Sequence, residues 1–131
     1  MSHSERTWTP VILPAEFRPP VGAYSPATKA GNLIFVSGQV PKDPRTGDTV
    51  STDIREQTRF VLANTERVLN AAGASLDDVV SVTAYLADMH DWEAFNEVYR
   101  DTFRRPYPAR TTVGAELRGF LVEISVVALV R

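Results

Sequence analysis

Apolar and small side chains recur at a helical period between residues 53 and 73, with charged side chains between them. Asp53 can cap the start of such a helix, Glu56 stands at capping-box spacing, and Gly73 suits the position just past the end. The pattern predicts a helix whose charged side is solvated surface. Its predicted buried side consists of Ile54, Thr58, Val61, Leu62, Thr65, Val68, Leu69 and Ala72.

An early β-hairpin is predicted before this helix. Residues 33–37 are apolar and rich in β-branched side chains, which is typical of a strand. Turn residues at 29–32 precede them and connect them to a strand near Ala27. Gly38 and Pro41 are expected to end the second strand of the hairpin.

A strand and a second helix follow the first helix. Residues 79–86 alternate and are β-branched, which predicts a strand. Asp88 or Asp91 can cap the helix after it, and Pro106 stops that helix. Its predicted buried stripe consists of Trp92, Phe95, Tyr99, Thr102 and Phe103.

The chain ends in two apolar segments, 110–115 and 120–130, that predict strands. Residues 1–20 hold four of the nine prolines and are expected to be partly irregular, with a short strand at 11–13. The order β-β-α-β-α-β-β predicts a single α+β domain over residues 1–131. Strand–helix–strand connections favour parallel neighbours and place both helices on one face of the sheet.

Both faces of the last predicted strand are apolar. Leu121, Val127 and Leu129 point one way, and the alternate positions from Val122 to Val130 point the other way. Two helices on one face cannot cover the other, so further surface must bury it. A homo-oligomer supplies that surface most simply.

Composition and charge exclude several classes of function. The 131 residues carry a net charge of −2 with scattered basic residues, so nucleic-acid binding is not expected. The absence of cysteine excludes disulfides, thiolate catalysis and cysteine metal sites, and it fits a cytoplasmic protein. The N-terminal residues lack the apolar core of a signal peptide, and the apolar run at 120–130 is too short to span a membrane.

No metal or cofactor is expected. His3 and His90 have no partner at metal-ligand spacing, and the seven glycines form no phosphate-binding loop. The candidate chemistry therefore rests on polar side chains within otherwise apolar segments. These are Tyr24, Ser37, Asn96, Arg110, Thr112 and Glu123.

Arg110 and Glu123 are the most informative of these residues, because strands this apolar are usually core. The guanidinium offers a fork of donors that fits a carboxylate. The glutamate could accept a proton or hold a water in the same pocket. Alternatively, the two side chains simply pair with each other across two strands. The residues alone lead to an oligomeric α+β domain with a candidate anion pocket.

Four segments, taken in order, resemble the RidA/YjgF family. They are Gly22-Ala23-Tyr24-Ser25 with Ala27, residues 31–41 (Gly-Asn-Leu-Ile-Phe-Val-Ser-Gly-Gln-Val-Pro), Pro108-Ala109-Arg110, and Leu121-Val122-Glu123-Ile124. Residues 43–47 and 95–99 also match the family pattern. The similarity covers nearly the whole chain from Pro20 onward, and the ordered set is much more specific than any single segment.

The resemblance implies a chorismate-mutase-like α+β protomer and a homotrimer with sites at the subunit interfaces. It also implies a deaminase that hydrolyses enamines and imines such as 2-aminoacrylate to 2-keto acids and ammonia, without metal or cofactor. The substrate implied is thus a small carboxylate. The trimer agrees with the two apolar faces of the last strand.

The resemblance also assigns roles to single residues. Arg110 falls on the family arginine that holds the substrate carboxylate, and Glu123 on the glutamate that positions the attacking water. Tyr24 matches a tyrosine that lines the pocket, and Ser37 matches a serine near it. Asn96 matches an asparagine of the second helix.

Several positions depart from the family pattern. Ala23 replaces a usual proline, and Thr112, which we expect to contact substrate, stands where many members have cysteine or valine. The connection from Val113 to Glu123 is slightly shorter than in the best-known members, and Ser125 replaces a frequent glutamate. Because these changes reshape the rim of the pocket, another enamine, such as 2-aminomuconate in a catabolic pathway, is an alternative substrate.

A second alternative comes from another class of function. It is a non-catalytic regulatory trimer that uses Arg110 to bind small carboxylates. The resemblance also connects some relatives with ribonuclease or translation-inhibiting activity, which the charge of this chain disfavours.

Overall fold

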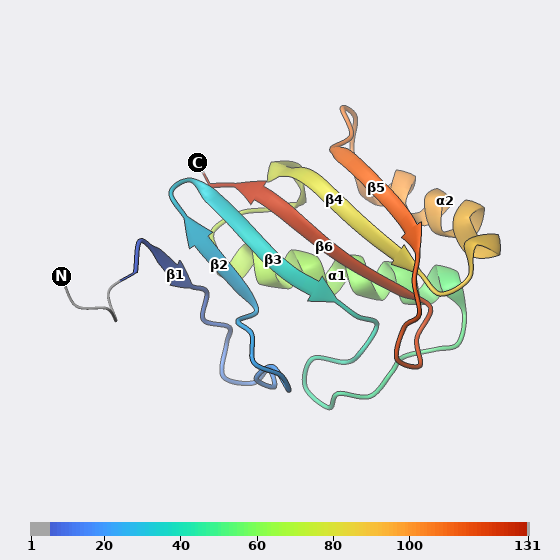
Figure 1. Ribbon diagram of the computed structural model, residues 1–131, viewed down its shortest axis with the longest axis horizontal. Coiled ribbons are helices and arrows are strands. Elements are labelled where there is room, and N and C mark those ends of the chain that lie inside the picture. The colour runs from blue at the N-terminus through green and yellow to red at the C-terminus, as the bar shows by residue number, and fades with distance from the viewer. Residues whose placement is uncertain (1–5, 131) are drawn as a thin grey trace.

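A mixed β-sheet with two helices packed on one of its faces forms the fold (Figure 1). The structure is a computed structural model that describes residues 6–130. In order, its elements are β1 (Trp8–Pro10), β2 (Ala27–Ala30), β3 (Leu33–Gln39), α1 (Ile54–Ala71), a 3₁₀ turn (Leu76–Asp78), β4 (Val79–Leu86), a 3₁₀ turn (Met89–Asp91), α2 (Trp92–Thr102), β5 (Ala109–Gly114) and β6 (Val122–Leu129).

The strand order across the sheet is β1-β2-β3-β6-β4-β5, with β5 at one edge. The predicted parallel pairing is confirmed for β4 and β5, which α2 connects. It does not hold for β3 and β4, because β6 inserts between them and runs antiparallel to both. The last strand of the chain is therefore central in the sheet, and it forms contacts on both sides.

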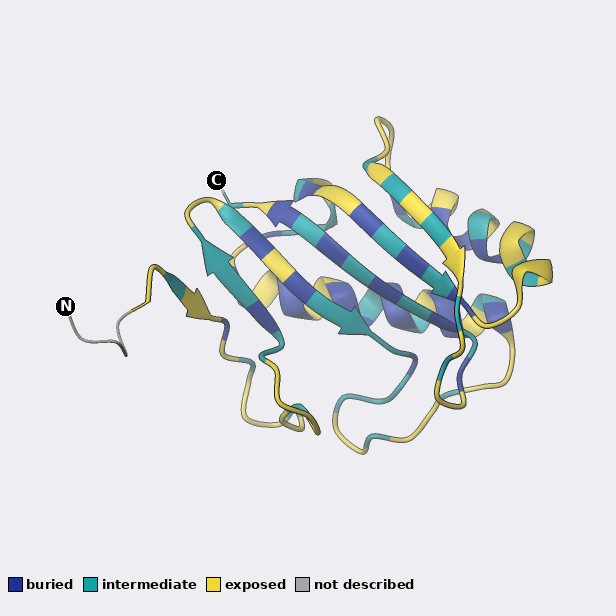
Figure 2. Cartoon of the chain, in the orientation of Figure 1, coloured by how far each residue is buried: buried dark blue, intermediate teal, exposed yellow. Residues whose placement is uncertain are grey.

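The core lies between the sheet and the helices. Along β6, Val122, Ile124, Val126 and Ala128 are buried on the helix side. The alternate residues, from Glu123 to Leu129, are half-buried or exposed on the other side, here called the open face (Figure 2). Phe35 and Leu129 on the open face are 43% and 39% exposed. The helix side is apolar as predicted, but on the open face only Val127 and Leu129 of the predicted side chains belong to β6, because the strand begins at Val122 and Leu121 lies in the loop before it.

The first helix begins and ends as its sequence predicts. The Asp53 carboxylate accepts a hydrogen bond from the backbone N–H of Glu56 at 3.0 Å. Gly73 has φ +85°, a left-handed conformation that a glycine adopts without strain just past a helix. All eight predicted positions on the apolar side are buried. The charged side carries the Arg55–Glu97 ion pair with α2.

Several local predictions are wrong. The N-terminal strand is β1 at Trp8–Pro10 rather than 11–13, although Val11 is buried and its N–H still donates to the carbonyl of Ala27. Strand β3 continues through Gly38 to Gln39, because a shift of register between Val36 and Gln39 accommodates the glycine.

The start of α2 also differs from its prediction. The Asp88 carboxylate accepts from the N–H of His90 and caps the 3₁₀ turn, whereas Asp91, at the N-cap position of α2, makes no side-chain capping bond. Trp92 is 37% exposed, so it does not belong to the buried stripe, and Thr102 is only half-buried. Within residues 6–130, neither helix is long and apolar enough to cross a membrane.

The Asp53 cap gives a direct test of the α1 assignment. Asp53→Ala leaves the N–H of Glu56 without its side-chain acceptor, and we expect the free energy of unfolding to fall by about 1 kcal/mol. Chemical denaturation measures this change. Glu66→Ala, a solvent-facing substitution in the middle of the same helix, is the control and should change stability much less.

Candidate functional site

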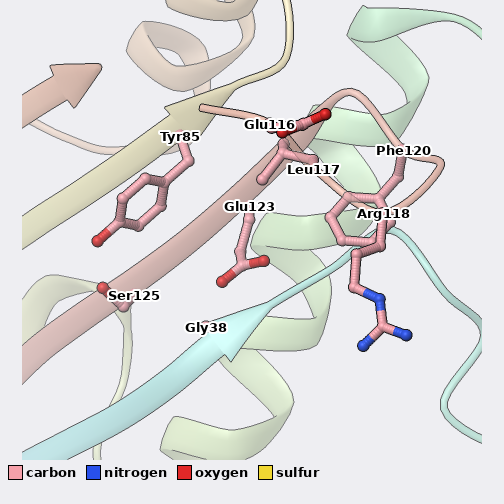
Figure 3. A pocket seen from close by; sticks show the side chains of 8 residues that line it. All are labelled: Gly38, Tyr85, Glu116, Leu117, Arg118, Phe120, Glu123 and Ser125. Atoms are coloured by element: carbon pink, nitrogen blue, oxygen red, sulfur yellow. The ribbon is translucent and has the colours of Figure 1, made fainter. Parts of the chain in front are cut away.

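Glu123 lies on the open face of the sheet, near the start of β6 (Figure 3). Its backbone pairs with Tyr85 of β4, and residues opposite each other on neighbouring strands share a face. A pocket of about 430 Å³ surrounds the carboxylate between these strands and the loop before β6. Gly38, Tyr85 and Ser125 are among its lining residues.

Gly38 lets the carboxylate of Glu123 lie against β3. A Cβ atom at position 38 would lie 2.9 Å from the Cδ of Glu123 and closer still to its Oε2. Any other residue would therefore push the carboxylate out of its place. The sequence analysis identified Gly38 as the expected end of a strand and as part of a family segment, but not as a neighbour of Glu123.

Within residues 6–130, no other group forms an ion pair or a hydrogen bond with the Glu123 carboxylate. Burial raises its pKa above the ordinary glutamate value, because desolvation disfavours the charged form. A half-buried carboxylate with free lone pairs and a raised pKa is suited to accept a proton from water.

Tyr24 and Ser37 join Glu123 along a larger cleft of about 870 Å³. Tyr24 is 54% exposed at its wall. The Ser37 hydroxyl donates to the carbonyl of Ser25 at 2.6 Å, next to Tyr24. Ser37 therefore fixes the segment that carries Tyr24, and only its lone pairs remain for a ligand. Three of the predicted site residues thus line one cleft.

Arg110 lies on the opposite face of the sheet. It pairs with Val82 of β4, which is buried in the core on the helix side. Glu123 pairs with Tyr85, whose side chain takes the other face. Strand β4 also lies between the two strands that carry Arg110 and Glu123. The alternative in which these two side chains pair within one chain is therefore excluded.

Three aromatic rings of α2 hold the guanidinium of Arg110. Its Cζ is 4.5 Å from the ring centroid of Tyr99, 5.5 Å from that of Phe95 and 5.6 Å from that of Trp92. These rings, here called the aromatic cradle, attract the cation through their negative faces. No ion pair among residues 6–130 involves Arg110. Its charge is positioned but not neutralised, as an anion-binding site requires.

Tyr99 has an unusual environment in this cradle. It is 3% exposed, and its hydroxyl has no hydrogen-bond partner in the described part of the chain. Burial raises the pKa of the phenol to about 12, against an opposing effect of the nearby Arg110. The hydroxyl thus stays neutral at physiological pH.

Thr112 and Asn96 belong to the Arg110 side. Thr112 follows Arg110 on β5 and shares its face, since its partner Ala84 is buried in the core. Asn96 is half-buried on α2 beside Phe95. The structure therefore divides the six predicted residues into two groups of three. Tyr24, Ser37 and Glu123 lie in the cleft. Asn96, Arg110 and Thr112 lie near the free edge of the sheet at β5.

The sequence analysis did not identify the residues that position the loop before β6. Gln57 of α1 is 2% exposed, and its side-chain oxygen accepts from the N–H of Leu121 at 2.8 Å. This bond fixes the loop that carries Arg118 and Phe120 beside Glu123. A glutamine on the apolar side of a predicted helix was the signal that could have revealed this contact.

No group of three or more acidic or histidine side chains within residues 6–130 could hold a metal ion. His90 is exposed and contacts Asp88 in the 3₁₀ turn. His3 lies outside the described residues.

The fold and the two groups of residues define an α+β domain with a carboxylate on its open face and an unpaired arginine at its edge. The profile of the family described as Endoribonuclease L-PSP matches residues 16–130. A RutC family protein of Pyrococcus horikoshii is 47% identical over 120 residues, which are 90% of this chain and 95% of that protein. The human 2-iminobutanoate/2-iminopropanoate deaminase is 36% identical over 121 residues, with coverage of 91% and 88%.

A solved structure of a relative has the same fold. Escherichia coli TdcF with bound serine superimposes with a TM-score of 0.82 at 30% identity, covering 92% of this chain and 98% of that one. The chain belongs to the YjgF/RidA family, which confirms the resemblance.

Tyr99→Phe tests whether the buried hydroxyl lacks a partner. Removing an unsatisfied hydroxyl while keeping the ring should leave the free energy of unfolding unchanged or raise it by about 1 kcal/mol. Tyr99→Leu also removes the ring and should be clearly destabilising. Denaturant unfolding of both variants measures the difference. A loss of stability in Tyr99→Phe would contradict the absence of a hydrogen-bond partner for this hydroxyl.

Proposed function

We propose that the protein is an enamine and imine deaminase that hydrolyses small 2-imino acids to 2-keto acids and ammonia. The observation that carries this proposal is the pair of unneutralised charges. Arg110 is held by aromatic rings without a counter-anion, and Glu123 is half-buried with a raised pKa. The name of the human relative describes the same reaction.

The active site forms between two protomers of a homotrimer. Arg110 and Glu123 lie on opposite faces of one sheet, so one chain cannot present both to a small molecule. In a cyclic trimer, the β5 edge of one protomer lies against the open face of the next, which is a head-to-tail contact. Such a contact brings Arg110 and Thr112 of one chain to Glu123 and Tyr24 of its neighbour. It also buries Phe35 and Leu129, which are exposed in the single chain.

Arg110 binds the carboxylate of the substrate through two parallel hydrogen bonds and so fixes the imine carbon. Glu123 accepts a proton from a water, whose oxygen bonds to that carbon and yields a carbinolamine. Glu123 returns this proton to nitrogen, and the hydroxyl proton of the carbinolamine then also passes to nitrogen as the C–N bond breaks, so that ammonia leaves as the carbonyl forms. Water supplies the oxygen of the keto acid.

The other residues shape the pocket. Tyr24 forms a wall of the cleft, and Ser37 holds the Tyr24 segment in place. Thr112 and Asn96 contact the substrate beside Arg110. The serine in TdcF indicates that a small amino acid fits the scaffold of a relative.

Mixing two inactive variants tests the shared site. Arg110→Ala and Glu123→Gln should each lose activity by tens- to thousands-fold, roughly the cost of removing one partner of a charged contact. If the two are refolded together at equal amounts, about a quarter of the sites in a cyclic trimer contain both native residues. We expect that fraction of wild-type imine hydrolysis to return, with light scattering confirming the trimer.

Three controls make this experiment decisive. Each variant refolded alone must remain inactive and trimeric. Arg110→Lys should be nearly as inactive as Arg110→Ala, because a point charge does not reproduce the fork of donors. An active monomer, or a mixture without recovered activity, would contradict a site shared between chains.

The rate of turnover should depend on pH through Glu123. In the complex, the substrate carboxylate neutralises Arg110, so burial determines the pKa of Glu123 and keeps it above the ordinary glutamate value. Glu123 acts as a base only when ionised, so kcat falls as the pH falls through this raised pKa. A profile of kcat against pH measures the inflection. An inflection at or below the ordinary glutamate value would contradict the assignment.

The non-catalytic binder remains the alternative from another class. Hydrolysis by the native protein separates the two functions, because a binder shows none. In the enzyme, Glu123→Gln loses turnover and still binds keto acids at Arg110. Deamination of another enamine, such as 2-aminomuconate, is the alternative within the same class, and a panel of substrates distinguishes it.

A further inference from the structure

The cleft beside Glu123 is positively charged, although the whole chain carries a net charge of −2. Two carboxylates line it, those of Glu123 and Asp43. Asp43 accepts hydrogen bonds from the N–H groups of Arg45 and Thr46, so it is occupied by its own turn. The cations that line the cleft are Arg18, Lys42, Arg67 and Arg118.

Two of these four cations already have acceptors. Arg18 donates to the carbonyl of Thr46, and Arg67 donates to the side chain of Asn64. Arg67 also lies over the ring of Phe60. These contacts fix both arginines as parts of the scaffold.

Lys42 and Arg118 are different. Neither side chain has an ion pair or a hydrogen bond with any other part of residues 6–130. The Nζ of Lys42 lies 5.8 Å from the ring centroid of Phe120, and Arg118 precedes that phenylalanine by two positions. Both cations line the cleft together with Phe120, Lys42 near its ring and Arg118 on the same loop.

Arg118 is also the cation next to the reacting position. With Phe120 and Glu123 it lines both the small pocket and the larger cleft. In Figure 3 its side chain extends past Phe120 on the side of the Glu123 carboxylate, whereas Glu116 of the same loop points away from that carboxylate. The bond from Gln57 to Leu121 holds this loop in place.

We propose that Lys42 and Arg118 bind a second anionic group at the far end of the substrate, so that imines of dicarboxylic amino acids are preferred. This inference rests on the proposed function, in which Arg110 takes the first carboxylate. The side chain of the substrate then extends from the imine carbon over Phe120 into the cleft. A second carboxylate on that chain meets both cations, and an uncharged chain meets neither.

A matched pair of substrates tests this specificity. The imines of glutamate and of 2-aminopentanoate have the same chain length and differ in the second carboxylate. An amino-acid oxidase generates each of them in the assay. We expect the native protein to show the higher kcat/KM for the imine of glutamate. Arg118→Gln should reduce that value about tenfold and reduce the value for the imine of 2-aminopentanoate much less. Lys42→Gln should act in the same direction.

The control is Arg59→Gln, which makes the same change of charge at an exposed position of α1 and should affect neither substrate. Equal losses for both imines in Arg118→Gln, or no loss for either, would overturn the proposal.

A binding measurement tests the second anion site independently of the proposed deaminase activity. Calorimetry with 2-oxoglutarate and 2-oxopentanoate measures affinity without turnover. A preference for 2-oxoglutarate that disappears in Arg118→Gln supports the second anion site even if no imine is hydrolysed, an outcome that would refute only the proposed reaction. The absence of any preference refutes the second anion site itself.

Discussion

The two-residue repeat of the β-sheet determines where chemistry can occur in this protein. Side chains alternate between faces, so the register that places Val82 and Ile124 in the core also places Arg110 on the helix side and Glu123 on the open face. The two charges cannot neutralise each other within the chain. A shift of one residue in β6 would bury Glu123 in the core, and a shift of one residue in β5 would turn Arg110 away from the aromatic cradle, so packing and charge separation depend on the same register.

Each of the two charges loses hydration in the folded chain, and the two faces of the sheet compensate for this loss differently. Under Arg110, the rings of Trp92, Phe95 and Tyr99 replace part of the hydration that the guanidinium loses. Among residues 6–130, no side chain forms an ion pair or hydrogen bond with the Glu123 carboxylate, and burial therefore raises its pKa. Gly38 makes this possible, because a side chain there would displace the carboxylate into a different environment.

The sequence predicted the α+β class, the first helix with its cap, strand β4 and the apolar open face, because each depends on local periodicity or on a capping residue. It could not predict that β6 inserts between β3 and β4, since pairing partners depend on contacts distant in sequence. For the same reason it left open whether Arg110 and Glu123 pair. It also missed Gln57, Tyr85 and Arg118, whose importance depends on the loop and the neighbouring strands.

An unpaired carboxylate on an apolar face is costly in a single chain, and that cost has a functional consequence. An internal partner such as Arg110 would lower the pKa of Glu123 and weaken it as a base. Because the sheet separates them, Glu123 keeps its basicity within one chain, and in the proposed trimer a neighbouring chain supplies the cation together with a substrate anion. In the proposed trimer, the association that buries Phe35 and Leu129 is therefore the same event that completes the site. There, Arg110 of one chain and Glu123 of its neighbour act on the same substrate, so activity and assembly are coupled through the geometry of one sheet.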